Sequence, residues 1–279
     1  MQLLSRFNRD FSLTVQVSAT QYVTVKPPMR VTFTASKSVN GGLNKLDIRI
    51  YNLNASNRAA LAKDVENQAK HIPVTFSVGY AGQLKVLFKG SVHRGENYRE
   101  GADLITQLTC IDGIYDHINS FTSKTVKGKS NAIDVLLSDM IYTQKGKITS
   151  QGELIRPRVL VGSSTKLISS MLESGETWYI DDGKLNIIKN DEVVSSLIPV
   201  VSYETGLINT PTRQMSKLTF DTLLNPSIRI GGLCDMVSAM APQYNGIYKV
   251  ETSAYSGDNY GSDWKQSITA IAARGYKVL

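Results

Sequence analysis

The sequence of 279 residues is poor in the side chains that most often bind metals or form disulfides, since it contains only two cysteines and three histidines. Cys110 and Cys234 lie far apart in apolar stretches, which favours small buried residues over a disulfide framework. His71, His93 and His117 form no metal-ligand spacing with Cys, Asp or Glu. We therefore predict no disulfide, no metal site and no cofactor.

Long hydrophobic runs are also missing. No segment approaches the ~20 apolar residues of a membrane-spanning helix, and residues 1–10 lack the apolar core of a signal peptide. We therefore predict no membrane insertion and expect assembly in the cytoplasm. The net charge of +7 permits contact with polyanions, but no run of Lys and Arg concentrates it. The densest basic stretch, Lys124–Lys129, is typical of a solvated loop.

The sequence lacks motifs for a catalytic nucleophile or for the binding of a nucleotide phosphate. Gly162-Ser163-Ser164 lacks the strand and helix context of a Gly-x-Ser-x-Gly nucleophile, and no glycine spacing matches a phosphate-binding loop. Both serines are better suited to cap a helix. Tyr244 and Tyr248 flank Asn245-Gly246, which fits a turn entering a strand better than a platform for stacked bases.

A pair of carboxylates is the one catalytic arrangement that the sequence could supply. Glu173, Glu176, Asp181 and Asp182 could be imagined across a sugar, as in a glycosidase. However, the two glutamates flank the end of a predicted helix, and the two aspartates lead a hairpin turn, where Asp is favoured on conformational grounds. We therefore predict no catalytic residue and no enzyme activity.

Alternation of apolar and polar residues dominates the first part of the chain and predicts half-buried strands over residues 11–35, 46–53, 74–78, 84–92 and 104–111. The expected inward positions are Leu13, Val15, Val17, Val31, Phe33, Ala35, Leu46, Ile48, Ile50, Val74, Phe76 and Val78. Between the strands, Asn54 or Ser56 can cap a helix limited by Pro73. Its expected face is Ala55, Ala59, Leu61, Ala62, Val65 and Ala69. Residues 1–120 are thus predicted to form an antiparallel β domain.

The middle of the chain has a different character. Ser130 is expected to cap the strongest helix, and a second helix is expected from Ser163 or Ser164 to Gly175. The apolar faces of these two helices are Ile133, Leu136, Leu137, Met140 and Ile141, and Leu167, Ile168, Met171 and Leu172. Trp178–Ile188 then carries Asp-Gly between apolar strands, a strong hairpin signal. Residues 121–200 are predicted to be a small α+β insert.

The C-terminal part returns to β character. A strand over 218–224 ends at Asn225-Pro226, a further strand is closed by Gly231-Gly232, and the polar loop 256–263 leads into Trp264. Residues 201–279 are predicted to form a second β-barrel domain. The expected fold is therefore mainly β with an α+β insert, in which two antiparallel β-barrel domains flank a small α+β domain.

Three places, taken in order, resemble the baseplate hub proteins of contractile-tailed bacteriophages. The first combines the strand 46–53 and its capped helix with 78–82, 88–90 and 108–113. The second is the helix pair with the hairpin at 178–188, and the third runs from Pro211 to Asp263-Trp264. Together these places cover most of the chain.

The resemblance implies a structural protein of the virion tail baseplate, in which both barrels are like those of tail tubes. It implies a homotrimer whose six similar domains form a pseudo-sixfold ring. This ring would join the hexameric tail tube to the trimeric central spike and leave a channel for DNA in transit, with tape measure and baseplate wedge proteins as further partners. Because a phosphate-attracting wall would slow DNA, we expect most of the +7 charge to lie away from the channel.

Other functions stay open at this stage. A tail tube protein would need only one barrel and a spike would show β-helix repeats, and the same holds for their equivalents in contractile bacteriocins and injection systems. A tail-associated cell-wall hydrolase would need a carboxylate pair, so that mutation of Glu173 or Glu176 would abolish lysis. A nucleic-acid-binding β-barrel module would show tight, salt-sensitive DNA binding.

Overall fold

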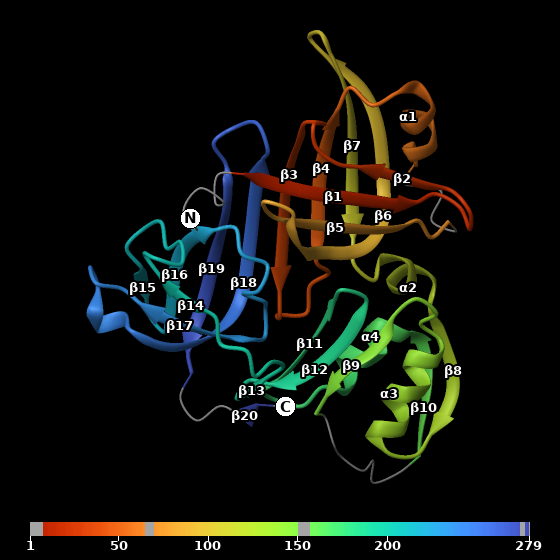
Figure 1. The fold of residues 1–279 in the computed structure, drawn as a ribbon. Helices are drawn as coiled ribbons and strands as arrows, with labels where there is room; N and C mark the ends of the chain where they lie inside the picture. The colour runs from red at the N-terminus through yellow and green to blue at the C-terminus, as the bar shows by residue number, and fades with distance from the viewer. Residues whose placement is uncertain (1–7, 65–69, 150–156, 274–276, 279) are drawn as a thin grey trace.

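The computed structural model describes residues 8–64, 70–149, 157–273 and 277–278 (Figure 1). One sheet of 13 strands dominates it, with the order β15-β16-β19-β18-β3-β4-β7-β6-β5-β1-β2, while β14 and β17 join alongside β18. Nearly all of its pairings are antiparallel. The prediction of a mainly β protein with an α+β insert is confirmed.

The N-terminal strands of this sheet are β1 (Arg9–Gln16), β2 (Tyr22–Val25), β3 (Val31–Ser38), β4 (Lys45–Tyr51), β5 (Pro73–Tyr80), β6 (Gln83–Glu100) and β7 (Asp103–Ile111). β6 serves two parts of the sheet, since its first half pairs with β5 and its second half with β7, with an irregular register between Val92 and Arg94. β1, β2 and β5 therefore fold back across β3, β4 and β7 (Figure 1).

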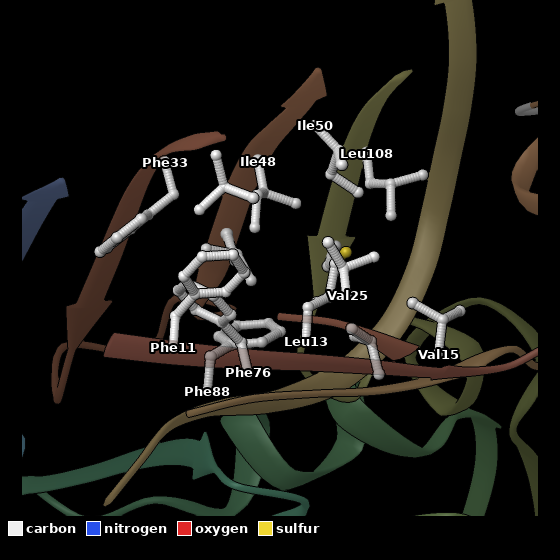
Figure 2. Close-up of a cluster of buried hydrophobic side chains, with 14 of the residues drawn as sticks. Phe11, Leu13, Val15, Val25, Phe33, Ile48, Ile50, Phe76, Phe88 and Leu108 are labelled. Atoms are coloured by element: carbon white, nitrogen blue, oxygen red, sulfur yellow. The ribbon is translucent and has the colours of Figure 1, made fainter. Parts of the chain in front are cut away.

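The first hydrophobic core fills the space enclosed by these strands (Figure 2). Every inward position predicted from the alternation is buried. Phe33 and Phe76 meet edge to face with ring centroids 4.8 Å apart, an arrangement that aromatic pairs favour. Cys110 lies fully buried in this core as a free thiol. Burial disfavours the charged thiolate and therefore raises the pKa of this thiol.

The helix after β4 is shorter than predicted. α1 (Ala55–Leu61) has Asn54 as its N-cap, whose Oδ1 accepts a hydrogen bond from Asn57 N at 2.8 Å. It ends at Leu61 because Lys63 leaves the helical path and exchanges backbone hydrogen bonds with Gly95 of β6. Ala62 is therefore extended. The predicted positions 65 and 69 lie outside the described residues.

The C-terminal strands are β14 (Val200–Ser202), β15 (Thr212–Gln214), β16 (Lys217–Leu223), β17 (Leu233–Val237), β18 (Gly246–Asp258) and β19 (Trp264–Ala272), with a 3-10 turn η2 (Pro242–Tyr244). β18 pairs with β19 along one edge, and along the other edge first with β17 and then with β3. A second core, which includes Phe220, Met236, Val250, Ile268 and the buried Cys234, lies beneath these strands. Burial raises the pKa of the Cys234 thiol to about 12.

The insert contains α2 (Ile114–Asn119), β8 (Phe121–Val126), α3 (Lys129–Ser138), β9 (Gln144–Ile148), β10 (Arg158–Ser163), α4 (Ser164–Met171), β11 (Glu176–Asp181) and β12 (Lys184–Lys189), followed by β13 (Glu192–Val193), which pairs with β20 (Lys277–Val278). β11 and β12 form the predicted hairpin, with Asp182 and Gly183 both at positive φ in its turn. A third core lies between this hairpin and the two main helices.

Three expectations for the insert were wrong in detail. α3 begins at Lys129 with Gly128 as its N-cap, so Ser130 lies inside its first turn. It also ends at Ser138, which leaves Ile141 outside the helix with 75% of its surface exposed. The stretch 124–129 is no solvated loop, because it ends β8 and begins α3. Ser163 is the N-cap residue of α4, as predicted.

Candidate functional site

A continuous polar surface covers the side of the large sheet opposite its cores. We call it the polar sheet face; it spans β16, β19, β18, β3, β4 and β7, and its strand registers align side chains into rows. It consists of Thr32, Thr34, Ser36, Lys45, Asp47, Arg49, Gln107, Thr109, Thr219, Asp221, Ala254, Ser256, Asp258, Lys265, Ser267 and Thr269. The face crosses from the C-terminal strands to the N-terminal strands without a break.

The polar sheet face is hollowed where the two parts of the chain meet. Two adjoining depressions of about 600 and 300 Å³ share Thr34, Lys45, Asp47 and Ser256. The first three residues come from β3 and β4, and Ser256 comes from β18. A depression formed jointly by both β units would be filled or distorted by any change in their relative position.

Charges on this face are balanced and locally satisfied. Three basic residues of this set, Lys45, Arg49 and Lys265, stand against three acidic residues, Asp47, Asp221 and Asp258. Lys217, on the same side of β16, is paired with Glu251 at 2.9 Å. Lys45 Nζ lies 2.8 Å from Asp47, which also accepts a hydrogen bond from Thr109 Oγ1 at 2.7 Å. Hydroxyl groups supply most of the remaining polar atoms. The face therefore has no excess of positive charge.

The insert has a basic stretch followed by an acidic one. Residues 121–171 contain eight basic and three acidic residues, a net +5, whereas residues 172–200 contain two basic and six acidic residues, a net −4, so the insert as a whole carries only +1 of the chain's +7. The described residues of 121–171 form strands and helices separate from the polar sheet face. The basic stretch 121–171 is thus separate from the surface that the two β units share.

The turn of the β11–β12 hairpin forms a second polar site, which we call the hairpin junction. Lys37 Nζ on β3 lies 2.6 Å from Asp181 and 3.3 Å from Asp182. Arg229 from the C-terminal unit lies 2.8 Å from Asp182, and Asn44 Nδ2 donates to the Ile180 carbonyl at 2.8 Å. The hairpin turn is thereby tied to both β units at once.

Burial sets the proton affinities at this junction. Desolvation opposes the charge of Lys37, but Asp181 and Asp182 more than offset it and hold the pKa of Lys37 above its ordinary value. Asp112 accepts hydrogen bonds from Gly183 N at 3.1 and 3.2 Å, yet it is only 1% exposed. Burial, reinforced by Asp181, raises the pKa of Asp112 to about 8.

The carboxylates considered from the sequence lie at two separate places. Asp181 and Asp182 belong to the hairpin junction, whereas Glu173 and Glu176 share the ammonium of Lys129 at 3.1 and 2.8 Å. Lys129 and the Glu176 side chain are almost fully buried. A shared buried cation explains both glutamates as parts of an ion-pair cluster that fixes α3 to β11.

The histidines occupy packing positions. His71 stacks on Tyr142 at 3.7 Å, and His117 Nδ1 lies 3.1 Å from Thr165 Oγ1. Within the described ranges, no group of three His, Cys, Asp or Glu side chains could hold a metal ion. Tyr248 donates its hydroxyl to the Tyr244 carbonyl at 2.9 Å across the turn that the sequence predicted. No helix in the described part of the chain has the length and apolar character of a membrane crossing.

Sequence reasoning placed Asp181 and Asp182 at a hairpin turn but missed Lys37, Asp112 and Arg229, the other charged residues of the hairpin junction. Lys37 carried a usable signal, because it continues the inward series Val31, Phe33 and Ala35 on β3 and so had to be buried with a partner. Arg229 and Asp112 carried no comparable signal, since both lie outside regular strands and become neighbours of the hairpin only in the folded chain.

Solved structures place this fold among tail proteins of phages and secretion systems. The 43 kDa tail protein of prophage MuSo2 from Shewanella oneidensis is similar with a TM-score of 0.63 and 9% identity, over 95% of this chain and 97% of that one. A tail protein of Neisseria meningitidis has a TM-score of 0.63 and 7% identity, over 94% and 96%. The E. coli c3393 protein, a type VI secretion component, has a TM-score of 0.64 and 9% identity, over 89% and 75%.

At these identities the likenesses show a shared fold. Comparison with curated proteins gives no significant match. A family model described as baseplate hub gp41 matches residues 11–264, which is most of the sequence. The chain belongs to this family of baseplate hub proteins. The resemblance drawn from the sequence motifs is thereby confirmed.

Proposed function

We propose that three copies of this chain form a pseudo-sixfold ring that joins the hexameric tail tube to the trimeric central spike of a phage tail. The observation that carries the proposal is the single sheet through which β18 and β3 unite two β units in one chain. A chain with two such units can match a sixfold neighbour at one end and a threefold neighbour at the other.

The domain division belongs to the same proposal: residues 1–120 and 201–279 are the two tube-like domains and 121–200 the insert. The three hydrophobic cores support it, because they are built mainly from residues 11–110, 201–270 and 126–187. Val39, Tyr179 and Ile188 join the C-terminal core from outside its range, so the cores are in contact with each other.

We assign the polar sheet face to the wall of a channel through which DNA passes. Its balanced charges and hydroxyl groups would offer no strong attraction to phosphate, whose contacts with proteins are dominated by Lys and Arg. The matched basic and acidic side chains of this face support the expectation that most positive charge lies away from the channel. The same balance disfavours a nucleic-acid-binding module.

The role is structural and not enzymatic. Family membership supports this, and so does the engagement of Glu173 and Glu176 with one buried lysine, which removes the reason to regard them as a hydrolase pair. The proposed partners are the tail tube protein and the central spike, with the tape measure and baseplate wedge proteins nearby. The protein would act in the virion tail after assembly in the host cytoplasm.

Cryo-electron microscopy of the particle tests the proposal directly. We expect three copies on the tail axis between tube and spike, with the polar sheet face toward the bore. Six copies in a repeating stack would instead make the chain a tube protein. An off-axis position would refute the hub role and reopen the hydrolase and binding-module alternatives.

A further inference from the structure

The chain contains two Asn-Gly sequences, Asn40-Gly41 and Asn245-Gly246. An asparagine in such a pair can lose its side-chain amide without a catalyst, because glycine has no side chain to hinder the approach of its backbone nitrogen to the asparagine Cγ. The glycine nitrogen gives up its proton and bonds to Cγ, and the amide nitrogen leaves as ammonia with that proton. Water then opens the cyclic imide at either carbonyl, which yields aspartate or isoaspartate without oxidation or reduction.

Access to solvent does not distinguish the two sequences. Asn40 and Asn245 are both exposed. A Cβ atom placed on Gly41 or on Gly246 would meet no atom within 4 Å, so both glycines border open space. Any difference in reactivity must therefore come from the hydrogen bonds that hold the reacting groups.

Asn40-Gly41 lies in the connection between β3 and β4, outside either strand. The backbone N of Asn40 donates to Ser38 Oγ at 3.1 Å. Within the part of the chain that the structure describes, neither the side-chain amide of Asn40 nor the backbone nitrogen of Gly41 has a hydrogen-bond partner. The Asn40 side chain can therefore turn toward Gly41 without breaking a hydrogen bond.

Asn245-Gly246 is held at both residues. Asn245 Oδ1 accepts a hydrogen bond from the backbone N of Ser238 at 2.7 Å, and Ser238 is buried. Gly246 begins β18 and is paired in register with Met236 of β17. Turning the Asn245 side chain toward Gly246 would leave the Ser238 N–H without its acceptor, and movement of Gly246 would open the end of the ladder.

We propose that Asn40 is a site of spontaneous deamidation in the folded protein, and that the turn around Asn245 protects the second Asn-Gly sequence. The connection that contains Asn40 also contacts the insert, because Leu43 forms a bridge with Ile180 and Asn44 Nδ2 donates to the Ile180 carbonyl at 2.8 Å. Deamidation would add a negative charge close to this contact, and isoaspartate would also add a backbone carbon. The reaction needs no partner and is independent of the proposed ring.

Peptide mapping of the full-length protein tests this site. The folded protein is held at pH 8 and 37 °C, digested briefly with trypsin at intervals and analysed by liquid chromatography with tandem mass spectrometry. The peptide of residues 38–45 should gain the mass of one deamidation and split into two products at Asn40. This change should be at least ten times faster than the change at Asn245 in the peptide of residues 230–249.

Two controls separate the effect of the fold from that of the local sequence. In concentrated urea both sequences should react at similar rates, because the fold no longer holds Asn245. Asn40→Gln should abolish the early product and leave Asn245 unchanged, because a glutamine side chain would have to close a larger ring, which forms more slowly.

Equal rates at the two sequences in the folded protein would overturn the assignment. The same conclusion would follow if Asn40 in the folded protein had not reacted by the time the unfolded chain had reacted completely. A difference between the two sites that persisted in urea would also overturn it, since the neighbouring residues and not the fold would then set the rates. Microscopy of the particle judges the hub proposal separately.

Discussion

Arg9 and Asp258 are 249 residues apart in sequence, yet Arg9 Nη1 donates a hydrogen bond to the Asp258 carbonyl at 2.8 Å. The other guanidinium nitrogen donates to the Ser262 carbonyl at 2.8 Å, and the group lies 5.9 Å from the centre of a Trp264 ring. The turn between β18 and β19 is thus held against the start of β1. The planar guanidinium, with its several donors, suits this cluster of carbonyls better than an ammonium would.

Replacement of Arg9 by Ala should therefore loosen the β18–β19 turn. Loss of several charge-assisted hydrogen bonds is expected to lower the free energy of unfolding by about 2 kcal/mol. Amide exchange at 258–263 should accelerate more than exchange in the core strands. The control is Arg99→Ala, since Arg99 donates only to the nearby Gly101 carbonyl. Unchanged exchange at 258–263 would show that Arg9 does not hold the turn.

Replacement of Lys37 by Met should destabilise the protein strongly. It would leave Asp181 without its closest cation in an environment where the carboxylate side chain is 11% exposed. Breaking such a buried pair costs about 3–5 kcal/mol, whereas Lys45→Met, at an ion pair whose side chains are 46% and 31% exposed, should cost less than about 1 kcal/mol. Urea unfolding measures both.

The double variant Lys37→Met with Asp181→Asn should recover part of the loss, because the unpaired buried charge is then removed. Equal effects of the Lys37 and Lys45 substitutions would contradict the role assigned to the hairpin junction. Additive effects of the Lys37 and Asp181 substitutions would contradict it too.

Asp112 should make stability fall as pH rises from about 4 to about 8. The folded chain retains the proton on Asp112 up to its raised pKa of about 8, whereas the unfolded chain releases it near the ordinary value of 3.8. In this window the unfolded state therefore binds fewer protons and gains relative stability with pH. Asp112→Asn should remove this loss and be more stable than wild type at pH 8–9 by about 1–3 kcal/mol.

Urea titrations at pH 5, 7 and 9 would reveal the trend for Asp112→Asn relative to wild type. Asp134→Asn, at a carboxylate whose side chain is 51% exposed, controls for the change in net charge. A constant difference between wild type and Asp112→Asn across this range would show that Asp112 is ionised throughout.

Positive charge added to the polar sheet face should slow DNA ejection. Thr34→Lys with Ser256→Lys would place two ammonium groups in the depression that both β units share. Attraction to phosphate should then retard passage, in a manner relieved by added salt. Ejection timed by a DNA-binding dye would detect the delay. Thr20→Lys with Gln21→Lys, in the exposed turn between β1 and β2, adds the same charge away from this face and should have no effect.

Local patterns predicted the strands well because burial of one face imposes a period of two, which Leu13, Phe33 and Ile48 obey. The hairpin at Asp182-Gly183 was equally readable, since its turn needs two residues at positive φ. Such patterns say which side of a strand is buried but not which strand lies beside it. The pairing of β18 with β3 joins residues more than 200 positions apart and had no local signal.

The same limit explains the helix errors and most of the candidate site. α1 stops at Leu61 because the chain at Lys63 pairs with Gly95, a tertiary contact that outweighs helical spacing. The polar sheet face could be inferred strand by strand from residues such as Thr34 and Ser256. Its continuity across both β units could be seen only once the order of the strands was known.

The strand β18 joins the two β units of one chain before any assembly begins. Because it is hydrogen-bonded to β17 and then to β3, the angle between the two β units is set by the twist of one shared strand. In a ring built from such chains, half of the joints between units exist before any chain meets another. Only the joints between chains cost translational and rotational entropy. A ring of six units therefore forms at the entropic cost of bringing together three chains and not six separate units.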